Sequence, residues 1–536
     1  MKYSIILNNI KLPVNASFKE AFSVARGRLK KLSVHAKDLD FAVYKRSIDA
    51  RNKRNILFVY SVIVTGELPL LSAFSLSKIG GVILENKEIE INFGTDTMTE
   101  RPLIVGAGPA GLFAALILAE NGYRPIIIER GESVKDRKKS VATFNEQGIL
   151  NPSSNIQFGA GGAGTFSDGK LITRINNPLS DYVLKKFVEF GAPKEILYSA
   201  RPHIGTDILS AIIDKMIDKI CSLGAEIQYN TRFIEVKRTF GTNYAVTDMG
   251  DIPFGVLVLA IGHSARDTYK SIIESDYAVE AKSFSVGMRI EHLAQDIDYA
   301  MYGDFAGNSA LGHAEYNLSY DTKNRGVYTF CMCPGGEVVA AASEAGGVVV
   351  NGMSYHSRNG KNSNSAVVCS VFKEDYGASP TQAINFQRKI EQAAFKAAGE
   401  DFSAPYTLVG DFLHGGVSGE PDKILPSYRG GKVTQVNPEK YLPDFVCNKI
   451  REAIQNFDKK ISGFANDKAI LTGPETRTSA PIRILRDNDT RLASGKSNIY
   501  PCGEGAGYAG GITSAAIDGI STALAVIKRF KPNTRE

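Results

Sequence analysis

One stretch near residue 100 constrains the fold more than any other part of the chain. Residues 103–105 are a short apolar run typical of a buried strand, and the G-x-G-x-x-G sequence of residues 106–111 follows at once. The Ala- and Leu-rich residues 112–121 predict a helix, and the apolar residues 126–128 predict a second strand that ends at Glu129. This order predicts a βαβ unit with a glycine turn at the start of its helix.

The residue types of this unit are those that a dinucleotide needs. The first glycine permits the tight turn, the second lets a pyrophosphate approach the backbone, and the third lets the helix pack closely on the strand. The helix N-terminus offers N–H groups and partial positive charge to phosphate. Glu129 can accept two hydrogen bonds from an adenosine ribose. The predicted cofactor-binding residues here are Gly106, Gly108, Pro109, Ala110, Gly111, Glu129 and Arg130.

A G-x-G-x-x-G match alone is weak support, because residues 159–164 and 505–510 match it as well. Only the match at 106–111 has a strand before it, a helix and a second strand after it, and an acid at the end of that strand. We therefore interpret only this match as the dinucleotide fingerprint.

The end of the chain points to the kind of dinucleotide. Residues 497–502 predict a strand that leads into Gly503 and Glu504, and a helix begins near Gly511 and Ile512. This resembles the second flavin-binding motif of flavoproteins with two dinucleotide-binding domains. The resemblance implies that the acid holds the ribityl chain and that the helix N-terminus faces the flavin pyrimidine ring. The usual acid is Asp, so Glu504 departs from the pattern.

A third piece lies between these two. Residues 256–261 predict a strand that ends at Gly262, and it resembles the Ala-Thr-Gly strand end of the same fold, with Ile261 in the Thr position. The glycine-rich loop at residues 158–170 supplies Gly162, Gly164, Thr165 and Ser167 as residues for the flavin side. The alternative for this loop is a cluster of surface turns. Together the pieces favour FAD as the cofactor.

The whole chain resembles the family of uncharacterised bacterial FAD-dependent dehydrogenases. The motifs that carry the resemblance are residues 45–51 (KRSIDAR), 158–170, 202–207 (PHIGTD), 331–336 (CMCPGG), 351–354 (NGMS) and 502–505 (CGEG). The resemblance implies a flavoprotein fold of the glutathione-reductase type with one nucleotide domain and an inserted substrate domain. It implies no physiological substrate. The chain has no second fingerprint for NAD(P)H and no C-x-x-x-x-C, so NAD(P)H can at most visit transiently.

This organisation predicts an α/β chain with a central parallel sheet and three parts. Residues 1–96 are expected to form a small basic α+β accessory domain of ferredoxin-like type. Its helix is expected at 18–32 and its strands at 40–44, 56–64 and 82–91, with a basic turn after the first of these strands and a polar linker at 92–101. Residues 97–270 with 495–536 are expected to form the FAD-binding domain, and residues 271–494 the inserted α+β substrate domain.

Several polar residues are candidates for chemistry. His203 and His263 follow predicted strand or loop positions and can transfer a proton, although a structural role is an equal alternative for both. Arg358 and Arg477 are candidate clamps for a carboxylate substrate, and Arg289 can pair with Glu291 across one face of a strand. No Cys or His spacing predicts a metal site.

The six cysteines include one C-x-C, Cys331 and Cys333. On a regular strand both side chains face the same side, and a disulfide between them would be strained. Apolar neighbours favour two small core thiols, and a redox role is the alternative. Few cysteines, spaced without a disulfide pattern, predict a reducing compartment.

Composition limits the remaining function classes. Apolar residues are 43% and charged residues 22%, as in ordinary globular proteins. Residues 102–119 carry no charge, but their glycines and proline favour a strand, turn and helix over a membrane span, so we expect a cytoplasmic protein. We predict an FAD-dependent oxidoreductase acting on a small-molecule substrate. Two alternatives stay open: a flavin-bearing redox sensor, and a flavoenzyme docking RNA or an acidic partner through Lys45, Arg46, Arg51, Lys53 and Arg54.

Overall fold

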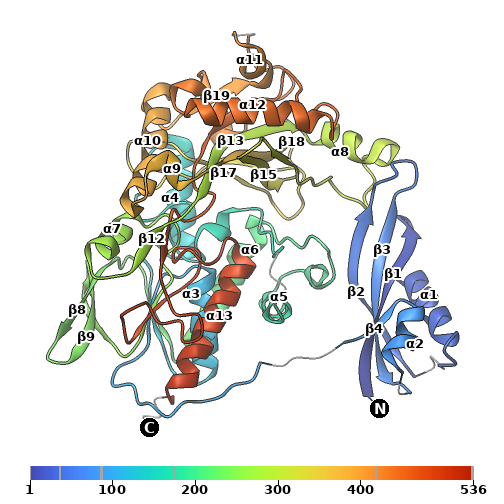
Figure 1. Cartoon of the computed structure of the whole chain (residues 1–536), viewed down its shortest axis with the longest axis horizontal. Coiled ribbons are helices and arrows are strands. Elements are labelled where there is room, and N and C mark those ends of the chain that lie inside the picture. The colour runs from blue at the N-terminus through green and yellow to red at the C-terminus, as the bar shows by residue number, and fades with distance from the viewer. Residues whose placement is uncertain are drawn as a thin grey trace.

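The computed structural model describes residues 2–34, 38–69, 71–84, 89–173, 177–416 and 419–532 of the 536-residue chain. It is a mixed α/β protein in which a four-stranded sheet, a five-stranded parallel sheet and a seven-stranded sheet each organise one part of the chain (Figure 1). Among the described residues no helix has the length and apolar character needed to cross a membrane.

The N-terminal unit has the chain order β-α-β-β-α-β, which is that of ferredoxin-like folds. Its elements are β1 (Lys2–Pro13), α1 (Phe18–Lys30), β2 (Asp40–Asp49), β3 (Leu57–Glu67), α2 (Ala73–Lys78) and β4 (Gly81–Leu84), and the sheet order is β2-β3-β1-β4. Alternate residues of β3 are buried, and α1 packs on them through the stripe Ala21, Ala25 and Leu29. Both helices lie on the side of the sheet that faces away from the other two sheets (Figure 1).

The structure corrects the expected strands of this unit. Strand β1 was not predicted, because a bulge between Leu7 and Ile10, with Asn9 at φ 58°, shifts the alternation of buried residues by one. Strand β2 runs on to Asp49, so the basic turn begins later than expected. The predicted strand 82–91 is observed only up to Leu84; residues 85–88 lie outside the described residues, and 89–91 are not strand.

The parallel sheet has the order β23-β11-β5-β6-β7. Its strands are β5 (Leu103–Val105), β6 (Ile126–Ile128), β7 (Glu226–Gln228), β11 (Leu257–Leu259) and β23 (Ile499–Pro501). Helices α3 (Pro109–Glu120), α13 (Ile512–Arg529), α5 (Leu179–Glu189) and α6 (Thr206–Ser222) pack together on one side, and α3 contacts α13 most extensively. Strand β6, the next parallel strand along the chain, pairs with one edge of β5, and β11 pairs with its other edge. The direction in which strands are added to the sheet therefore reverses at β5. Ligands of such sheets bind at this point.

The remaining elements surround this sheet. Near it lie α4 (Val134–Gln147), the antiparallel strands β8 (Phe233–Thr239), β9 (Thr242–Thr247) and β10 (Gly250–Phe254), and α7 (Arg266–Glu274). A short pair, β12 (Val279–Ala281) and β22 (Ile482–Ile484), leads into and out of the next part.

The seven-stranded sheet lies above the parallel sheet in the view of Figure 1 and is called the roof sheet, or roof, below. Its order is β14 (Ser319–Asp321), β15 (Gly326–Cys333), β18 (Asn362–Val371), β13 (Phe284–Leu293), β21 (Ile470–Glu475), β19 (Ala404–Leu408) and β20 (Val433–Gln435). Helices α8 (Ala294–Tyr302), α9 (Lys373–Tyr376), α10 (Pro380–Ala398), α11 (Val409–His414) and α12 (Asp444–Asp458) lie around its outer side, and the pair β16 (Glu337–Ala340) and β17 (Val350–Met353) lies under it. All ten residues of β13 are buried, so its polar side chains must find partners inside the protein.

The N-terminal unit joins the rest of the chain at an edge of its sheet. Arg46 of β2 donates its N–H to the carbonyl of Tyr198 at 2.6 Å, and the N–H of Ala200 donates to the carbonyl of Arg46 at 2.9 Å. The Arg46 guanidinium lies over the rings of Phe18, Phe58 and Tyr198, with its carbon 4.9–5.8 Å from their centroids. One side chain thus connects α1, β3 and the segment that precedes His203.

Removal of the Arg46 side chain should loosen this junction. Each exposed cation–π contact contributes roughly 0.5–1 kcal/mol, so Arg46→Ala is expected to speed amide hydrogen exchange at Arg46 and Ala200 by about tenfold. Arg54→Ala, at an exposed position of the same unit, is the matched control and should change neither rate. Equal exchange in both variants would show that the backbone pairing alone holds the junction.

Candidate functional site

The glycine turn after β5 is packed so tightly that side chains are excluded. Gly106 has φ 103°, and a Cβ there would lie 2.4 Å from the carbonyl oxygen of Ala260. A Cβ on Gly111 would lie 1.9 Å from the carbonyl oxygen of Gly106. Pro109 and Ala110 are the first residues of α3, with Gly108 as the N-cap. The turn therefore delivers the N-terminus of α3 to the switch point of the sheet.

A second glycine segment faces this turn. Gly162 has φ 63°, and a Cβ added to Gly108 would meet only the Cα of Gly162, at 3.7 Å. The next residues form a short 3-10 helix (Ala163–Phe166), and Gly164 packs against Ile512 of α13. Two stretches of bare backbone thus lie opposite each other beside the N-terminus of α3.

The polar side chains of this segment bond within the protein. Thr165 is fully buried; its hydroxyl donates to the carbonyl of Ala160 at 3.4 Å, and its own carbonyl accepts a hydrogen bond from the Thr206 hydroxyl at 2.7 Å. The Ser167 hydroxyl donates to the carbonyl of Gly164 at 2.7 Å and accepts from the N–H of Gly169 at 3.1 Å. Thr165 and Ser167 therefore shape the loop in this structure.

A buried arginine that the sequence analysis missed holds the loop. The guanidinium of Arg137, on α4, is completely buried and donates five hydrogen bonds to backbone carbonyls. Its acceptors are Asn155, Ile156, Gly159, Ala160 and Gly162. Burial lowers its pKa to about 9, against the opposing effect of Glu129, so it stays charged at neutral pH. The charged Lys-Asp-Arg-Lys-Lys run around it resembles a solvated helix face, and no spacing signal separates it from its neighbours.

Glu129 bonds the backbone from the opposite side. Its carboxylate accepts the N–H groups of Ala107 at 2.8 Å, Gly131 at 2.9 Å and Gly159 at 3.0 Å. A carboxylate offers about four acceptor positions, so about one remains for a ligand. Arg130 beside it stacks on Phe158 at 4.3 Å and donates to Asp267 at 2.8 Å.

Residues 503–512, near the C-terminus, pack against the glycine turn at the start of α3. Gly503, at φ 75°, lies against Ala110, and Gly505 lies against the backbone of Gly262. The N–H of Gly503 donates to Asp518 at 2.7 Å. Gly511 is the N-cap of α13 and Ile512 its first residue, beside Gly164. The structure therefore brings together the glycine-bearing segments near residues 106–111, 159–164, 262 and 503–512. The backbone surface that these segments share is called the glycine channel below.

Glu504 carries a carboxylate without a local partner. It makes no hydrogen bond and no ion pair with the side chains and backbone that the structure describes, and only Lys282 acts on it from a distance. Burial raises its pKa to about 7, against the opposing effect of Lys282. A half-buried acid with spare acceptors beside a glycine channel is suited to bind ligand hydroxyls.

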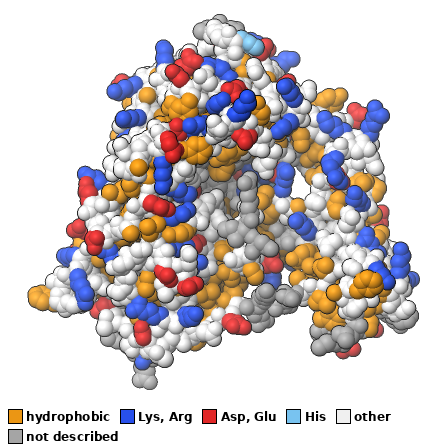
Figure 2. All heavy atoms as spheres, viewed as in Figure 1, with side chains coloured by type: hydrophobic (Ala, Val, Ile, Leu, Met, Phe, Trp, Pro, Cys, Tyr) orange, Lys and Arg blue, Asp and Glu red, His pale blue; other side chains and the backbone are white. Residues whose placement is uncertain are grey.

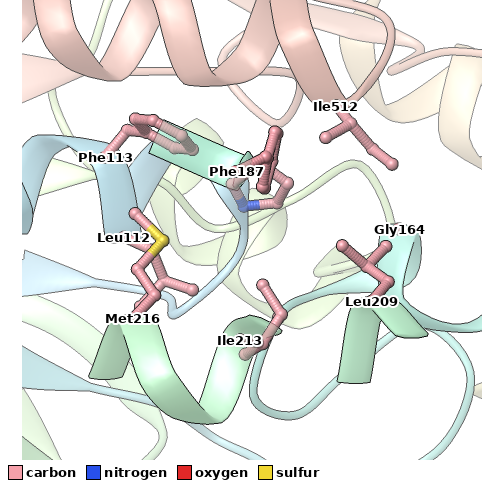
Figure 3. A pocket seen from close by; sticks show the side chains of 10 residues that line it. Leu112, Phe113, Gly164, Phe187, Leu209, Ile213, Met216 and Ile512 are labelled. Atoms are coloured by element: carbon pink, nitrogen blue, oxygen red, sulfur yellow. The ribbon is translucent and has the colours of Figure 1, made fainter. Parts of the chain in front are cut away.

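A small apolar cavity lies behind this channel (Figure 3). Its free space, about 260 Å³ when open solvent is included, is mostly too narrow to admit a water molecule. Its walls are Pro109, Leu112, Phe113, Gly161, Gly164, Phe187, Leu209, Ile213, Met216 and Ile512. Because no polar side chain enters it, it offers nothing that would orient a polar substrate. A wider groove of about 850 Å³ lies between α7 and α10, with Arg266, Glu344 and Arg388 among its lining.

The two candidate histidines lie in different surroundings. His203 pairs with Lys170 through an isolated β-bridge, stacks on His356 at 5.3 Å, and lies near Asp168 and Arg358. Burial, and then Arg358, lower its pKa, so it is neutral at pH 7. Burial and the nearby Arg477 and Arg266 lower the pKa of His263 to about 3. The structure thus places only His203 beside Lys170 and Asp168.

Arg289 and Arg477, both singled out from the sequence, form buried ion pairs. Arg289 does not bond Glu291, as its strand spacing allowed; it pairs with Glu475 of the neighbouring strand at 2.6 Å, while Glu291 bonds Ser427. Sequence spacing could not reveal this, because β21 joins β13 only in the tertiary fold. The carboxylate of Glu391 lies between Arg266 at 2.7 Å and Arg477 at 3.1 Å, so Arg477 is already paired.

Arg358 lies closer to the channel. It bonds Asp168 at 2.8 Å and also pairs with Glu315, but its Nε is buried without an acceptor among the described residues. Although burial raises the Asp168 pKa, Lys170 and Arg358 hold it at about 2.

The C-x-C pair meets the expectation of core thiols only in part, because Cys333 is fully buried and Cys331 is half-buried. Strand β15 shifts register between Phe330 and Cys333, and Cys331 has φ 44°, so the regular alternation does not apply. Two cations also act on the thiols: Arg289 is 3.9 Å from the Cys333 sulfur, and Lys170 acts on both sulfurs.

Comparisons with known proteins agree with a flavin-binding chain. A family model described as an FAD binding domain matches residues 101–148, and one described as FAD-dependent protein, C-terminal domain-like, matches residues 283–478. A domain of unknown function (DUF8436) matches residues 4–65. A protein of Clostridium beijerinckii, described as uncharacterised, is 45% identical over 536 residues, covering 98% of this chain and 99% of that protein.

Solved structures are only distantly similar. CtdE in complex with FAD is 12% identical, covers 80% of this chain and 84% of its own, and has a TM-score of 0.31. L-amino acid deaminase from Proteus vulgaris is 10% identical, with coverages of 83% and 94% and a TM-score of 0.35. Scores this low carry no argument about the arrangement of the domains or the reaction.

Replacement of Arg137 should damage the channel more than any other single change on α4. Arg137→Met removes a donor from five carbonyls and leaves those of Asn155 and Ile156 with no other donor among the described residues, so the free energy of unfolding should fall by about 3 kcal/mol. Lys138→Met, on the exposed side of the same helix, is the control and should stay within about 0.5 kcal/mol of the parent. Denaturant unfolding checks both values; equal losses would contradict the role given to Arg137.

Glu504 should make stability depend on pH. Its pKa is raised from an ordinary 4.5 to about 7 in the folded chain, so its stabilising effect is complete below pH 4.5 and is lost as the pH rises through 7. Relative to Glu504→Gln, the flavin-free protein should therefore lose unfolding free energy between pH 4.5 and 7. Glu475 titrates near the same pH in both proteins and cancels in the difference. A pH-independent difference would contradict the burial of Glu504.

Proposed function

We propose that this chain, which belongs to the same family as the Clostridium beijerinckii protein, is an FAD-dependent oxidoreductase that moves a hydride between FAD and an organic substrate or NAD(P)H. The observation that supports it most directly is the meeting of Gly108 and Gly162, where backbone faces backbone beside the N-terminus of α3. A pyrophosphate requires such a surface, since any side chain there would hold it away from the N–H groups. We also propose the division into residues 1–96, 97–270 with 495–536, and 271–494.

The residues that would hold FAD follow from their places around the channel. The N-terminus of α3, with Gly108, Pro109 and Ala110, would bind the pyrophosphate, and the remaining acceptor of Glu129 the ribose. The Glu504 carboxylate, which makes no hydrogen bond with the residues that the structure describes, would accept hydrogen bonds from ribityl hydroxyls.

The N-terminus of α13 would face the isoalloxazine ring of a bound FAD. Gly511 and Ile512 would give its partial positive charge to the pyrimidine edge, and Gly162 and Gly164 would line the approach with backbone. When bound, FAD supplies a hydride acceptor and donor at N5.

Residues between the channel and the roof would handle the substrate. His203 is neutral at pH 7 and could accept a proton as the substrate loses a hydride. Arg358 has a buried N–H group without an acceptor among the described residues, which suits a carboxylate or carbonyl oxygen. His263, with a pKa near 3 and two arginines beside it, is the weaker proton acceptor at neutral pH.

The two alternative functions receive less support. Of the five basic residues considered for RNA or an acidic partner, Arg46 is held among aromatic rings and Arg51 pairs with Asp49 at 2.6 Å. On the face seen in Figure 2, the described Lys and Arg side chains are scattered among acidic and apolar ones. The sensor hypothesis needs slow turnover, which the reduction experiment below measures.

The first test asks whether the channel binds FAD. Gly108→Ala should leave the fold intact, because its Cβ would have ordinary contact with Gly162, yet it should fill the surface that the phosphates need. FAD affinity should fall at least about tenfold, as followed by the flavin absorbance retained on purification. Gly27→Ala, where a Cβ meets nothing within 4 Å, is the control. Full flavin content in Gly108→Ala would contradict the proposed site.

The second test asks where the electrons come from. Anaerobic addition of NADH or NADPH to the flavin-loaded protein should bleach the flavin bands if a nicotinamide is the donor. Bands that persist with both would leave an organic substrate as the donor, and persistence through a screen of organic donors would favour the sensor.

A further inference from the structure

The C-x-C pair lies at an irregular end of β15, beside the charged groups of the roof. Cys331 is half-buried and Cys333 is buried, and both are free thiols. Cys331 has φ 44°, a conformation unusual for a residue with a side chain, and the register of β15 on β18 shifts here. In this conformation the single S–H proton of Cys333 has two acceptors within reach, the Cys331 sulfur and the carbonyl of Cys331 at 3.2 Å.

A buried lysine charge faces the pair. The Nζ of Lys170 is buried and has no hydrogen-bond acceptor among the described residues. Its nearest carboxylate, Asp168 at 3.5 Å, also binds Arg358 and Ser354, so it does not neutralise Lys170 by itself. Burial opposes the protonated form of Lys170, and the C-x-C sulfurs and Asp168 favour it, so the pKa of Lys170 is raised. An anionic sulfur would complete the charge balance of this cluster.

A second cation borders the same thiols. Arg289 donates to the carbonyl of Cys331 at 3.1 Å and lies 3.9 Å from the Cys333 sulfur. Its own charge is shared with Glu475, whose pKa burial raises to about 7. Asp168, Lys170, Arg289 and Glu475 are thus the titratable or charged groups that surround the pair.

The two sulfurs are not equivalent. The hydrogen bond from Cys333, opposed by burial and aided by Lys170 and Arg289, lowers the pKa of Cys331 well below its ordinary value. The same hydrogen bond, and burial, raise the pKa of Cys333. Burial raises the pKa of the other four cysteines, Cys221, Cys369, Cys447 and Cys502. Of the six cysteines, Cys331 alone combines a lowered pKa with partial exposure, the two features that favour attack on another sulfur.

We propose that Cys331 and Cys333 are a redox-active pair that closes to a disulfide by exchange with a low-molecular-weight disulfide, with Cys331 attacking first. This adds a second redox group to the chain, and it does not depend on flavin. The irregular backbone at Cys331, the contact between the thiols and the buried lysine Nζ without a hydrogen-bond acceptor among the described residues together carry the inference.

The exchange balances without another reagent. The Cys331 thiolate attacks one sulfur of the small disulfide, so that the S–S bond breaks, a mixed disulfide forms on Cys331 and one thiolate leaves. Cys333 then attacks the Cys331 sulfur, the second thiolate leaves, and the disulfide between Cys331 and Cys333 forms. The two cysteines lose two electrons to the small disulfide; the Cys333 proton goes to one leaving thiolate, and the other exchanges protons with solvent.

Oxidised glutathione is the probe for the exchange. The purified full chain, incubated with it at pH 7 and then mapped by mass spectrometry, should show a disulfide between Cys331 and Cys333 and free thiols at Cys221 and Cys369. Cys333→Ser should instead accumulate the mixed disulfide on Cys331, because the second attack is lost, and Cys331→Ser should form neither product.

Lysine variants separate the charge effect from packing. The rate at which iodoacetamide alkylates Cys331 should titrate at a pH well below that of Cys221 in the same sample. Lys170→Met should slow alkylation of Cys331 at pH 7 by about tenfold, since one pKa unit changes the thiolate fraction tenfold, and Lys170→Arg should restore it.

Three results would overturn the inference. They are a wild-type protein that keeps both thiols free, one that stops at the mixed disulfide, and one in which Cys331 and Cys221 alkylate with the same pH dependence. Because flavin-free protein should give the same products, failure here is distinguishable from failure to bind FAD.

Discussion

The clamp of Arg137 and Glu129 on the glycine loop is the interaction on which the candidate site depends. The arginine donates to five carbonyls of residues 155–162, while the glutamate accepts the N–H of Gly159 in the same loop. A loop with four glycines in six residues has many conformations to lose, and a buried charge with five acceptors selects one of them. The selected conformation places Gly162 opposite Gly108.

Buried charge also fixes the roof relative to the parallel sheet. Glu391 of α10 lies between Arg266 of α7 and Arg477 after β21, so one carboxylate joins an element near the nucleotide site to the sheet above it. Arg289 and Glu475 do the same between two strands of the roof. Each pair would be costly if broken, because a single buried charge would remain. The space between sheet and roof is therefore held by directional contacts, and its polar side chains keep defined positions.

The predictions that rested on local pattern agree with the structure where the elements are short and regular. The strands at 103–105 and 126–128, the glycine turn and the helix after it were all placed from adjacent residues, because a buried strand and a Gly-led helix leave a local signature. Strand β1 was missed because its bulge breaks that signature at Asn9. Cys331 was misjudged for the same reason, since a positive φ in a strand cannot be inferred from alternation.

By itself, the sequence determined a βαβ unit built for a dinucleotide, glycines at positions that tolerate no side chain, and the order of the segments that meet there. Only the tertiary structure decided which charges became partners. Arg137 looks like its exposed neighbours in the chain, and Lys170 is far in sequence from Cys331, Arg289 from Glu475 and Arg266 from Glu391. Spacing along a chain reports contacts within one element, whereas burial and pairing arise where distant elements pack, so the residues that control the chemistry of the site emerge only in the folded protein.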